Sequence, residues 1–167
     1  MRNIFLIGFM GCGKSTIARM ISKKLGVAQV EMDELIVEEL GMSITEIFEK
    51  FGEEHFRDIE TDLVHRLQEK DGVVVSCGGG AVLREENRNM MKESGVIVLL
   101  TAQPETILAR VKNSTNRPVL NGNMNVEYIT ALMERRKACY EDAADITVAT
   151  DGKSVEEICE EIIEKIG

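Results

Sequence analysis

The chain has 167 residues, of which 44% are hydrophobic, 29% charged and 4% aromatic, a composition typical of one folded domain and not of a disordered or membrane-embedded chain. The formal net charge of −9 argues against a nucleic-acid partner, because a phosphate backbone is bound through a basic surface. Four cysteines and two histidines show no spacing typical of a metal site or a disulfide framework, so we expect a reduced, cytoplasmic setting.

Five short apolar runs alternate along the chain with segments of helical period. They are residues 4–7, 27–32, 73–76, 96–100 and 146–149. Strands that read as continuous apolar runs between helices indicate a parallel sheet with helices on both faces. The sequence therefore predicts an α/β fold, and we expect residues 1–167 to form one domain.

Three helices have clear beginnings. One follows the first strand over residues 14–25. Ser43 and Glu46 have the spacing of a capping box and predict a helix over 44–51, and Ser154 and Glu157 predict the last helix in the same way.

A polar stretch rich in turn formers breaks the alternation at residues 113–125, which include Arg117-Pro118 and Asn121-Gly122. Loops of about a dozen residues in a compact domain are commonly functional. We therefore expect a lid over about residues 112–125.

Directly after the first strand comes Gly-Phe-Met-Gly-Cys-Gly-Lys-Ser-Thr, residues 8–16, which matches the phosphate-binding loop G-x-x-x-x-G-K-[ST]. Its backbone N–H groups and the following helix N-terminus would surround a phosphate. The predicted nucleotide-binding residues here are Gly11, Cys12, Gly13, Lys14, Ser15 and Thr16. Lys14 would reach the β- and γ-phosphates, and Ser15 would bind Mg²⁺.

The rest of the chain favours a small kinase among nucleotide-binding proteins. A switch GTPase would carry Asn-Lys-x-Asp, which is absent, and a motor ATPase would need a longer chain. Phosphoryl transfer needs a carboxylate at the acceptor, cations at the phosphates and exclusion of water. The acceptor site is expected beyond the carboxyl ends of the strands, where Asp33 and the three glycines 78–80 occur.

Candidate cations are Arg57, with Glu60 one helical turn further on to orient it, Arg117 in the predicted lid, and the pair Arg135-Arg136. Cys12 and Cys77 are expected to border the same cleft, because each is adjacent to one of the glycine-rich segments.

Taken together, these segments resemble the shikimate kinase family. The matching pieces are residues 8–19, Asp33, residues 41–48 (GMSITEIF), residues 52–60 (GEEHFRDIE), the three glycines, Arg117-Pro118 and residues 136–145. The resemblance implies a nucleoside-monophosphate-kinase fold with a five-stranded parallel sheet in the order 2-3-1-4-5. It implies transfer of the γ-phosphoryl group of ATP to the 3-hydroxyl of shikimate, on the route to chorismate and the aromatic amino acids.

The resemblance also implies roles for single residues. Asp33 would hold the substrate hydroxyls and take the reacting proton, within a substrate-binding segment of about residues 33–60. Arg57 and Arg136 would bind the carboxylate, beside backbone donors of Gly78, Gly79 and Gly80. Arg117 would contact the phosphates, and Arg110 and the 151–154 loop, with Lys153, would flank the adenine.

Two departures from the family pattern matter for the site. Glu31 stands where the family commonly has Asp, and we expect it to hold Mg²⁺ through a water while Ser15 binds the ion directly. Ala138 stands in place of a proline, which leaves open whether Arg135 or Arg136 faces the substrate.

Two other functions remain as alternatives. One is a different small-metabolite kinase of this fold, similar to gluconate kinases. The other is a non-catalytic nucleotide-binding module, which should have lost Lys14, Asp33 or Arg117, whereas this chain keeps all three. The expected partners are ATP and shikimate, with no nucleic acid and no membrane, and the expected state is a monomer.

Overall fold

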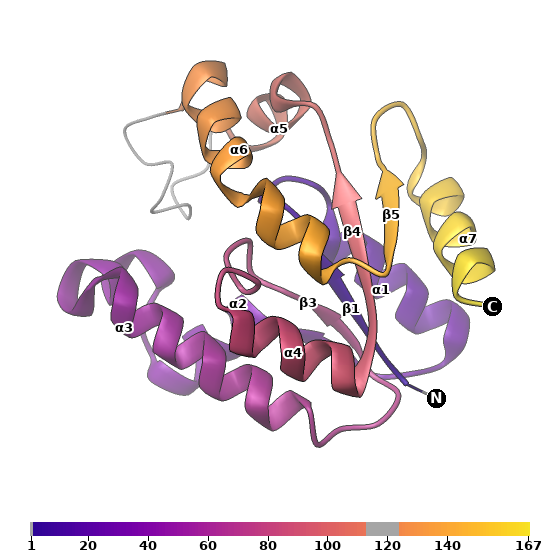
Figure 1. Ribbon diagram of the computed structural model, residues 1–167, viewed down its shortest axis with the longest axis horizontal. Coiled ribbons are helices and arrows are strands. Elements are labelled where there is room, and N and C mark those ends of the chain that lie inside the picture. Colours follow the sequence, from indigo (N-terminus) through magenta and orange to yellow (C-terminus); the bar gives the residue numbers. More distant parts are fainter. Residues whose placement is uncertain (1, 113–123) are drawn as a thin grey trace.

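The computed structural model describes residues 2–112 and 124–167, so Arg117 and most of the predicted lid lie outside the described residues. Its centre is a parallel sheet in the order β2-β3-β1-β4-β5 (Figure 1), and this confirms the predicted fold. The strands are β1 (Asn3–Ile7), β2 (Gln29–Glu31), β3 (Val74–Ser76), β4 (Gly95–Thr101) and β5 (Ile146–Ala149).

Helices cover both faces of this sheet (Figure 1). They are α1 (Lys14–Leu25), α2 (Met32–Leu40), α3 (Ile44–Leu67), α4 (Glu85–Ser94), α5 (Pro104–Val111), α6 (Val126–Ala143) and α7 (Val155–Ile166). Consecutive strand residues point to opposite faces, so each strand contributes to two separate cores.

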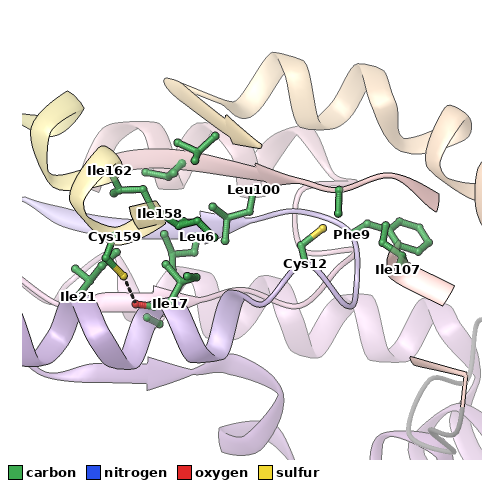
Figure 2. Close-up of a cluster of buried hydrophobic side chains, with 14 of the residues drawn as sticks. Leu6, Phe9, Cys12, Ile17, Ile21, Leu100, Ile107, Ile158, Cys159 and Ile162 are labelled. Atoms are coloured by element: carbon green, nitrogen blue, oxygen red, sulfur yellow. Dashed lines mark hydrogen bonds between the residues drawn. The ribbon is translucent and has the colours of Figure 1, made fainter. Parts of the chain in front are cut away.

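The first core lies between the sheet and the helices α1 and α7. Ile4 and Leu6 of β1 meet Ile17 of α1 and Ile162 of α7 there, and all four are buried. Figure 2 shows Leu6, Ile17 and Ile162 in this core, together with the Cys159 thiol, which donates a 3.8 Å hydrogen bond to the Ile17 carbonyl oxygen. The last helix thus packs against α1, the helix that follows the phosphate loop.

The second core lies on the opposite face, under α2, α3, α4 and the C-terminal part of α6. Phe5 and Ile7, the alternate residues of β1, pack there with Phe56 of α3 and Tyr140 of α6. This core fixes α3 and α6 relative to the sheet, and these two helices carry the buried arginines of the site described below.

The helix that begins after Ser43 is interrupted at Gly52, as predicted. Gly52 has the non-helical angles φ 85° and ψ 168°, and a second helical segment continues from this kink to Leu67. The second strand is shorter than predicted because Met32 already begins α2. Both predicted capping boxes are confirmed, at Ser43–Glu46 and Ser154–Glu157.

Candidate active site

A cavity of about 800 Å³ opens at the carboxyl ends of β1, β2 and β3. Its walls come from the phosphate loop (residues 8–16), α2, α3, residues 78–80 and α6. This is the edge where parallel α/β sheets place their ligands.

The phosphate loop forms one end of the cavity. Gly13 caps α1 with φ 86° and ψ 21°, a left-handed conformation that favours glycine. The ammonium group of Lys14 lies inside the curled loop, where Nζ donates to the carbonyl oxygens of Gly8 at 2.7 Å and Phe9 at 3.1 Å. The loop therefore keeps its cation beside the α1 N-terminus, where anions are favoured.

Oxygen atoms gather between the phosphate loop and the second strand. Ser15 Oγ donates to Glu31 Oε2 at 2.8 Å and lies 3.4 Å from Ser76 Oγ. Gln29 Nε2 donates to the other carboxylate oxygen of Glu31. One carboxylate and two hydroxyl groups are donors of the kind that Mg²⁺ prefers, with room for the waters that this ion retains.

Residues 78–80 occupy the centre of the cavity wall, and each glycine is in contact with a charged side chain. A methyl group on Gly78 would lie 2.8 Å from Asp33 Oδ1 and 2.8 Å from Glu60 Oε2. One on Gly79 would lie 3.3 Å from Arg136 Nη1, and one on Gly80 would overlap the guanidinium of Arg57. These glycines are needed for space, because none of the three has a positive φ. We call Asp33, Arg57, Glu60, residues 78–80 and Arg136 the acceptor pocket.

Arg57 is held by two carboxylates of its own helix. Nη1 donates to Glu60 Oε1 at 2.7 Å, and Nη2 donates to Glu53 Oε2 at 3.1 Å. Arg57 is 7% exposed and Glu60 is 1% exposed, so this is a buried ion pair with a fixed geometry.

Glu60 uses only one carboxylate oxygen in this pair. Its Oε2 is buried and has no hydrogen-bond partner among the described residues. Burial raises the pKa of Glu60 to about 7 and the charge of Asp33 acts in the same direction, although Arg57 opposes both. The pocket therefore contains a carboxyl group that titrates near neutral pH.

Arg136, and not Arg135, faces the cavity. Arg136 is 4% exposed and lies over the ring of Phe9, with Cζ 5.7 Å from the ring centroid, whereas Arg135 is exposed. Arg136 Nη1 is buried and has no hydrogen-bond partner in the described part of the chain. A buried guanidinium nitrogen without an acceptor is costly, and an anionic ligand in the cavity would remove that cost.

An apolar wall completes the cavity, and sequence analysis did not identify it. Val37, Ile44, Phe48 and Phe56 line the side formed by α2 and α3. The rings of Phe48 and Phe56 lie 5.1 Å apart. The packing of α2 against α3 places this surface in the cavity.

Most of the predicted site residues meet in this one cavity. The lining includes Gly11, Gly13, Lys14, Ser15, Thr16, Glu31, Asp33, Arg57, Gly78, Gly79, Gly80, Arg110 and Arg136. Arg110 donates from Nη1 to the Gly11 carbonyl oxygen at 2.8 Å. Lys153 does not line the cavity and forms an ion pair with Glu161 at 2.9 Å.

The two cysteines near the site behave differently from one another. Cys77 lines the cavity. The Cys12 side chain instead points into the first core, among Phe9, Leu100 and Ile107 (Figure 2). Burial raises the pKa of its thiol, although Lys14 and Arg110 lie nearby. Cys12 thus contributes backbone to the phosphate loop while its sulfur packs in the core.

Across residues 2–112 and 124–167, no helix combines the length and apolar character needed to cross a membrane. Within the same residues, no group of three or more His, Cys, Asp or Glu side chains has the arrangement of a metal site.

The chain is similar to known proteins in both sequence and structure. A family model described as shikimate kinase matches residues 10–167. The shikimate kinase of Geobacter sulfurreducens is 46% identical over 161 residues, which cover 96% of this chain and 88% of the relative. The structure of shikimate kinase from Acinetobacter baumannii in complex with shikimate has a TM-score of 0.96 and 32% identity, covering 99% of this chain and 93% of that one. A gluconokinase from Sinorhizobium meliloti, with a TM-score of 0.57, 20% identity, and coverage of 98% and 90%, shares the fold alone.

Proposed function

The chain belongs to the shikimate kinase family, and we propose how its residues divide the work of that family's reaction. The enzyme transfers the γ-phosphoryl group of ATP to the 3-hydroxyl of shikimate. Three tasks follow from this chemistry: binding the carboxylate of the acceptor, activating its hydroxyl, and neutralising the phosphates.

Arg57 and Arg136 bind the carboxylate of shikimate. The observation that carries this assignment is the pair of buried guanidinium groups packed against Gly80 and Gly79, one of them with an unpartnered nitrogen. Planar guanidinium groups recognise carboxylates through paired hydrogen bonds. On a chain of net charge −9, two buried arginines in one cavity favour an anionic ligand.

Asp33 acts on the acceptor hydroxyl. It stands in the first turn of α2, beside Gly78, and lines the same cavity as the apolar wall residues Phe48 and Phe56. That wall suits the carbon ring of shikimate, and the carboxylate suits its hydroxyl groups. A positioned carboxylate both orients the reacting oxygen and accepts its proton.

The phosphate loop binds ATP through its backbone N–H groups, with Lys14 as the cation. Arg110 contacts this loop at Gly11 and so flanks the nucleotide. We assign the 151–154 loop, with Lys153, to the edge of the adenine site. Arg117, which lies outside the described residues, is assigned to the phosphates.

Mg²⁺ fits the oxygen cluster of Ser15, Glu31 and Ser76. In this assignment Ser15 would hold the ion directly and Glu31 would hold it through a water. The ion would supply positive charge beside the phosphates when bound. We further propose that the enzyme is a monomer of one domain. Four unpaired cysteines support a reducing, cytoplasmic location.

A coupled assay with shikimate and gluconate in parallel tests the substrate, and one pair of variants tests the carboxylate site. We expect Arg136→Gln to raise the KM for shikimate on the order of tenfold to a hundredfold, because a charged hydrogen bond is lost. Arg135→Gln, the exposed neighbour, should leave KM within about twofold. Turnover of gluconate alone, or equal behaviour of the two variants, would contradict the assignment.

A further inference from the structure

Tyr140 connects α6 with the glycine segment across 61 residues of sequence. It follows Arg136 by one helical turn, and its ring is 7% exposed within the second core. Its hydroxyl donates a 2.7 Å hydrogen bond to the Gly79 carbonyl oxygen. Nothing in the reaction described above uses this hydroxyl.

The bond fixes a peptide group that lies between the two arginines of the acceptor pocket. Gly79 lies against Arg136, with 3.3 Å between Nη1 and the position of a methyl group, and Gly80 packs against Arg57. There is no cis peptide bond in the described ranges. In a planar trans peptide the C=O and N–H bonds point in opposite directions. A hydrogen bond that holds the Gly79 carbonyl therefore also fixes the direction of the Gly80 N–H. It fixes the plane of this peptide group, which lies between the two guanidinium groups.

Tyr140 is suited to this task as a permanent donor. Burial raises the pKa of its phenol to about 12, while the charge of Arg136 acts in the opposite direction. The hydroxyl thus keeps its proton throughout the physiological range of pH and cannot become a phenolate that would repel the Gly79 carbonyl oxygen.

We propose that Tyr140 is a positioning residue for the carboxylate of the acceptor: it fixes the Gly79–Gly80 peptide and so sets the spacing between Arg57 and Arg136. The inference rests on the proposed function, because it requires these two arginines to bind the carboxylate. It assigns no contact between Tyr140 and the substrate.

The test compares Tyr140→Phe with Tyr128→Phe. The chain has two tyrosines, and both lie on α6, so the second variant is a matched control for loss of a phenol hydroxyl. For Tyr140→Phe we expect the dissociation constant for shikimate, measured by calorimetry without ATP, to rise about tenfold. We expect kcat and the KM for ATP to stay within about threefold. Tyr128→Phe should leave all of these values unchanged.

Binding of the methyl ester of shikimate distinguishes two possible roles of Tyr140, which are positioning the carboxylate site and supporting the fold in general. The ester has no negative charge, so it gains little from correctly spaced guanidinium groups. Tyr140→Phe should weaken binding of shikimate but bind the ester as the unmodified enzyme does. An equal loss for acid and ester, or no loss for the acid, would overturn the inference.

Arg136→Gln distinguishes failure of this inference from failure of the proposed function. If Arg136→Gln weakens shikimate binding and Tyr140→Phe does not, only the role of Tyr140 is wrong. If neither variant weakens it, the carboxylate site itself is wrong.

If Tyr140→Phe does not fold, 3-fluorotyrosine in the Tyr128→Phe background labels position 140 alone. The fluorine resonance should then shift more with saturating shikimate than with saturating ester, and equal shifts would overturn the inference.

Discussion

The phosphate loop and the acceptor pocket line the same cavity, but the chain builds them in different ways. The phosphate loop is one continuous segment, residues 8–16, whose Lys14 is held by carbonyl oxygens of the same loop. The acceptor pocket takes its groups from α2, α3, the segment after β3, and α6. One is a local backbone structure and the other is a product of packing.

Glycine serves a different purpose in each region. In the phosphate loop, Gly11 and Gly13 have positive φ values of 83° and 86°, so a side chain would strain the backbone. Residues 78–80 have no positive φ and instead leave room for Asp33, Glu60, Arg136 and Arg57. An added methyl group should therefore affect the substrate in one region and the loop conformation in the other.

Charge differs between the regions as well. The acceptor pocket holds Arg57, Glu60 and Arg136 almost completely buried, where each charge depends strongly on its neighbours. On the nucleotide side Lys14 is buried as well, but it is held by carbonyl oxygens of its own loop, and Arg110 is exposed. Substitutions of the charged side chains in the pocket should therefore be coupled to one another, whereas substitutions of Lys14 and Arg110 should act more independently.

The largest expected effect concerns the acceptor pocket. Asp33→Asn keeps the shape of the side chain but cannot accept the proton, so kcat should fall on the order of a hundredfold or more. Glu34→Gln, the next acid on α2, should lower kcat by less than about threefold. Steady-state kinetics at saturating ATP and shikimate measure both. Full activity of Asp33→Asn, or its rescue by excess Mg²⁺, would show that Asp33 and Glu31 have been assigned the wrong way round.

Gly80→Ala tests the role of space in the pocket. The new methyl group would overlap the Arg57 guanidinium, so the KM for shikimate should rise at least about tenfold while the KM for ATP stays constant. Gly26→Ala is the control, since Gly26 has φ 66° and no atom within 4 Å of the added methyl group. That variant should lose roughly 1–2 kcal/mol of stability but retain its kinetics. If the KM for shikimate were unchanged in Gly80→Ala, residue 80 would not need to be glycine for space. The proposed difference between the glycines of the two regions would then be wrong.

Glu31 tests the nucleotide side. Glu31→Gln removes the charge that faces the Mg²⁺ site, so the Mg²⁺ concentration at half-maximal rate should rise severalfold. Glu31→Asp keeps the charge, and a bridging water tolerates the shorter side chain, so this variant should be nearly silent. Mg²⁺ titrations at saturating shikimate compare the two. A Glu31→Gln enzyme indifferent to Mg²⁺ would refute the assignment.

The last effect concerns the stability of the fold and its dependence on pH, and not the kinetics. The pKa of Glu60 is raised from 4.5 to about 7 by burial, so between these values the folded state keeps a proton that the unfolded state has lost. The free energy of unfolding should therefore fall as pH rises through this window, by at most about 3 kcal/mol. Urea unfolding at pH 5 and pH 7.5 should show this fall in the unmodified enzyme and a smaller one in Glu60→Gln.

Glu54→Gln provides the control for that comparison, because Glu54 is an exposed acid of the same helix. It should follow the pH dependence of the unmodified enzyme. Identical pH dependence in Glu60→Gln and Glu54→Gln would mean that Glu60 is charged throughout.

Local sequence determined much of this protein. The phosphate loop, both capping boxes and the α/β class follow from residue types at short spacing, because turn, cap and strand preferences depend on a few neighbouring residues. The strand order and the substrate came from the resemblance to a family, and not from periodicity. The three glycines 78–80 predicted that other groups approach the backbone closely, but the sequence did not show which side chains these are.

Tertiary structure decided what depends on contacts between distant segments. Arg135 and Arg136 are equivalent in sequence, and only the rotation of α6 against the sheet buries one and exposes the other. The Cys12 sulfur points into the core because Leu100 and Ile107 pack beside it, although its backbone belongs to the phosphate loop. Tyr140 reaches Gly79 because the second core brings α6 beside the glycine segment. Such contacts are set by how buried surfaces pack together, and the residues within one helical turn or one loop do not determine that packing.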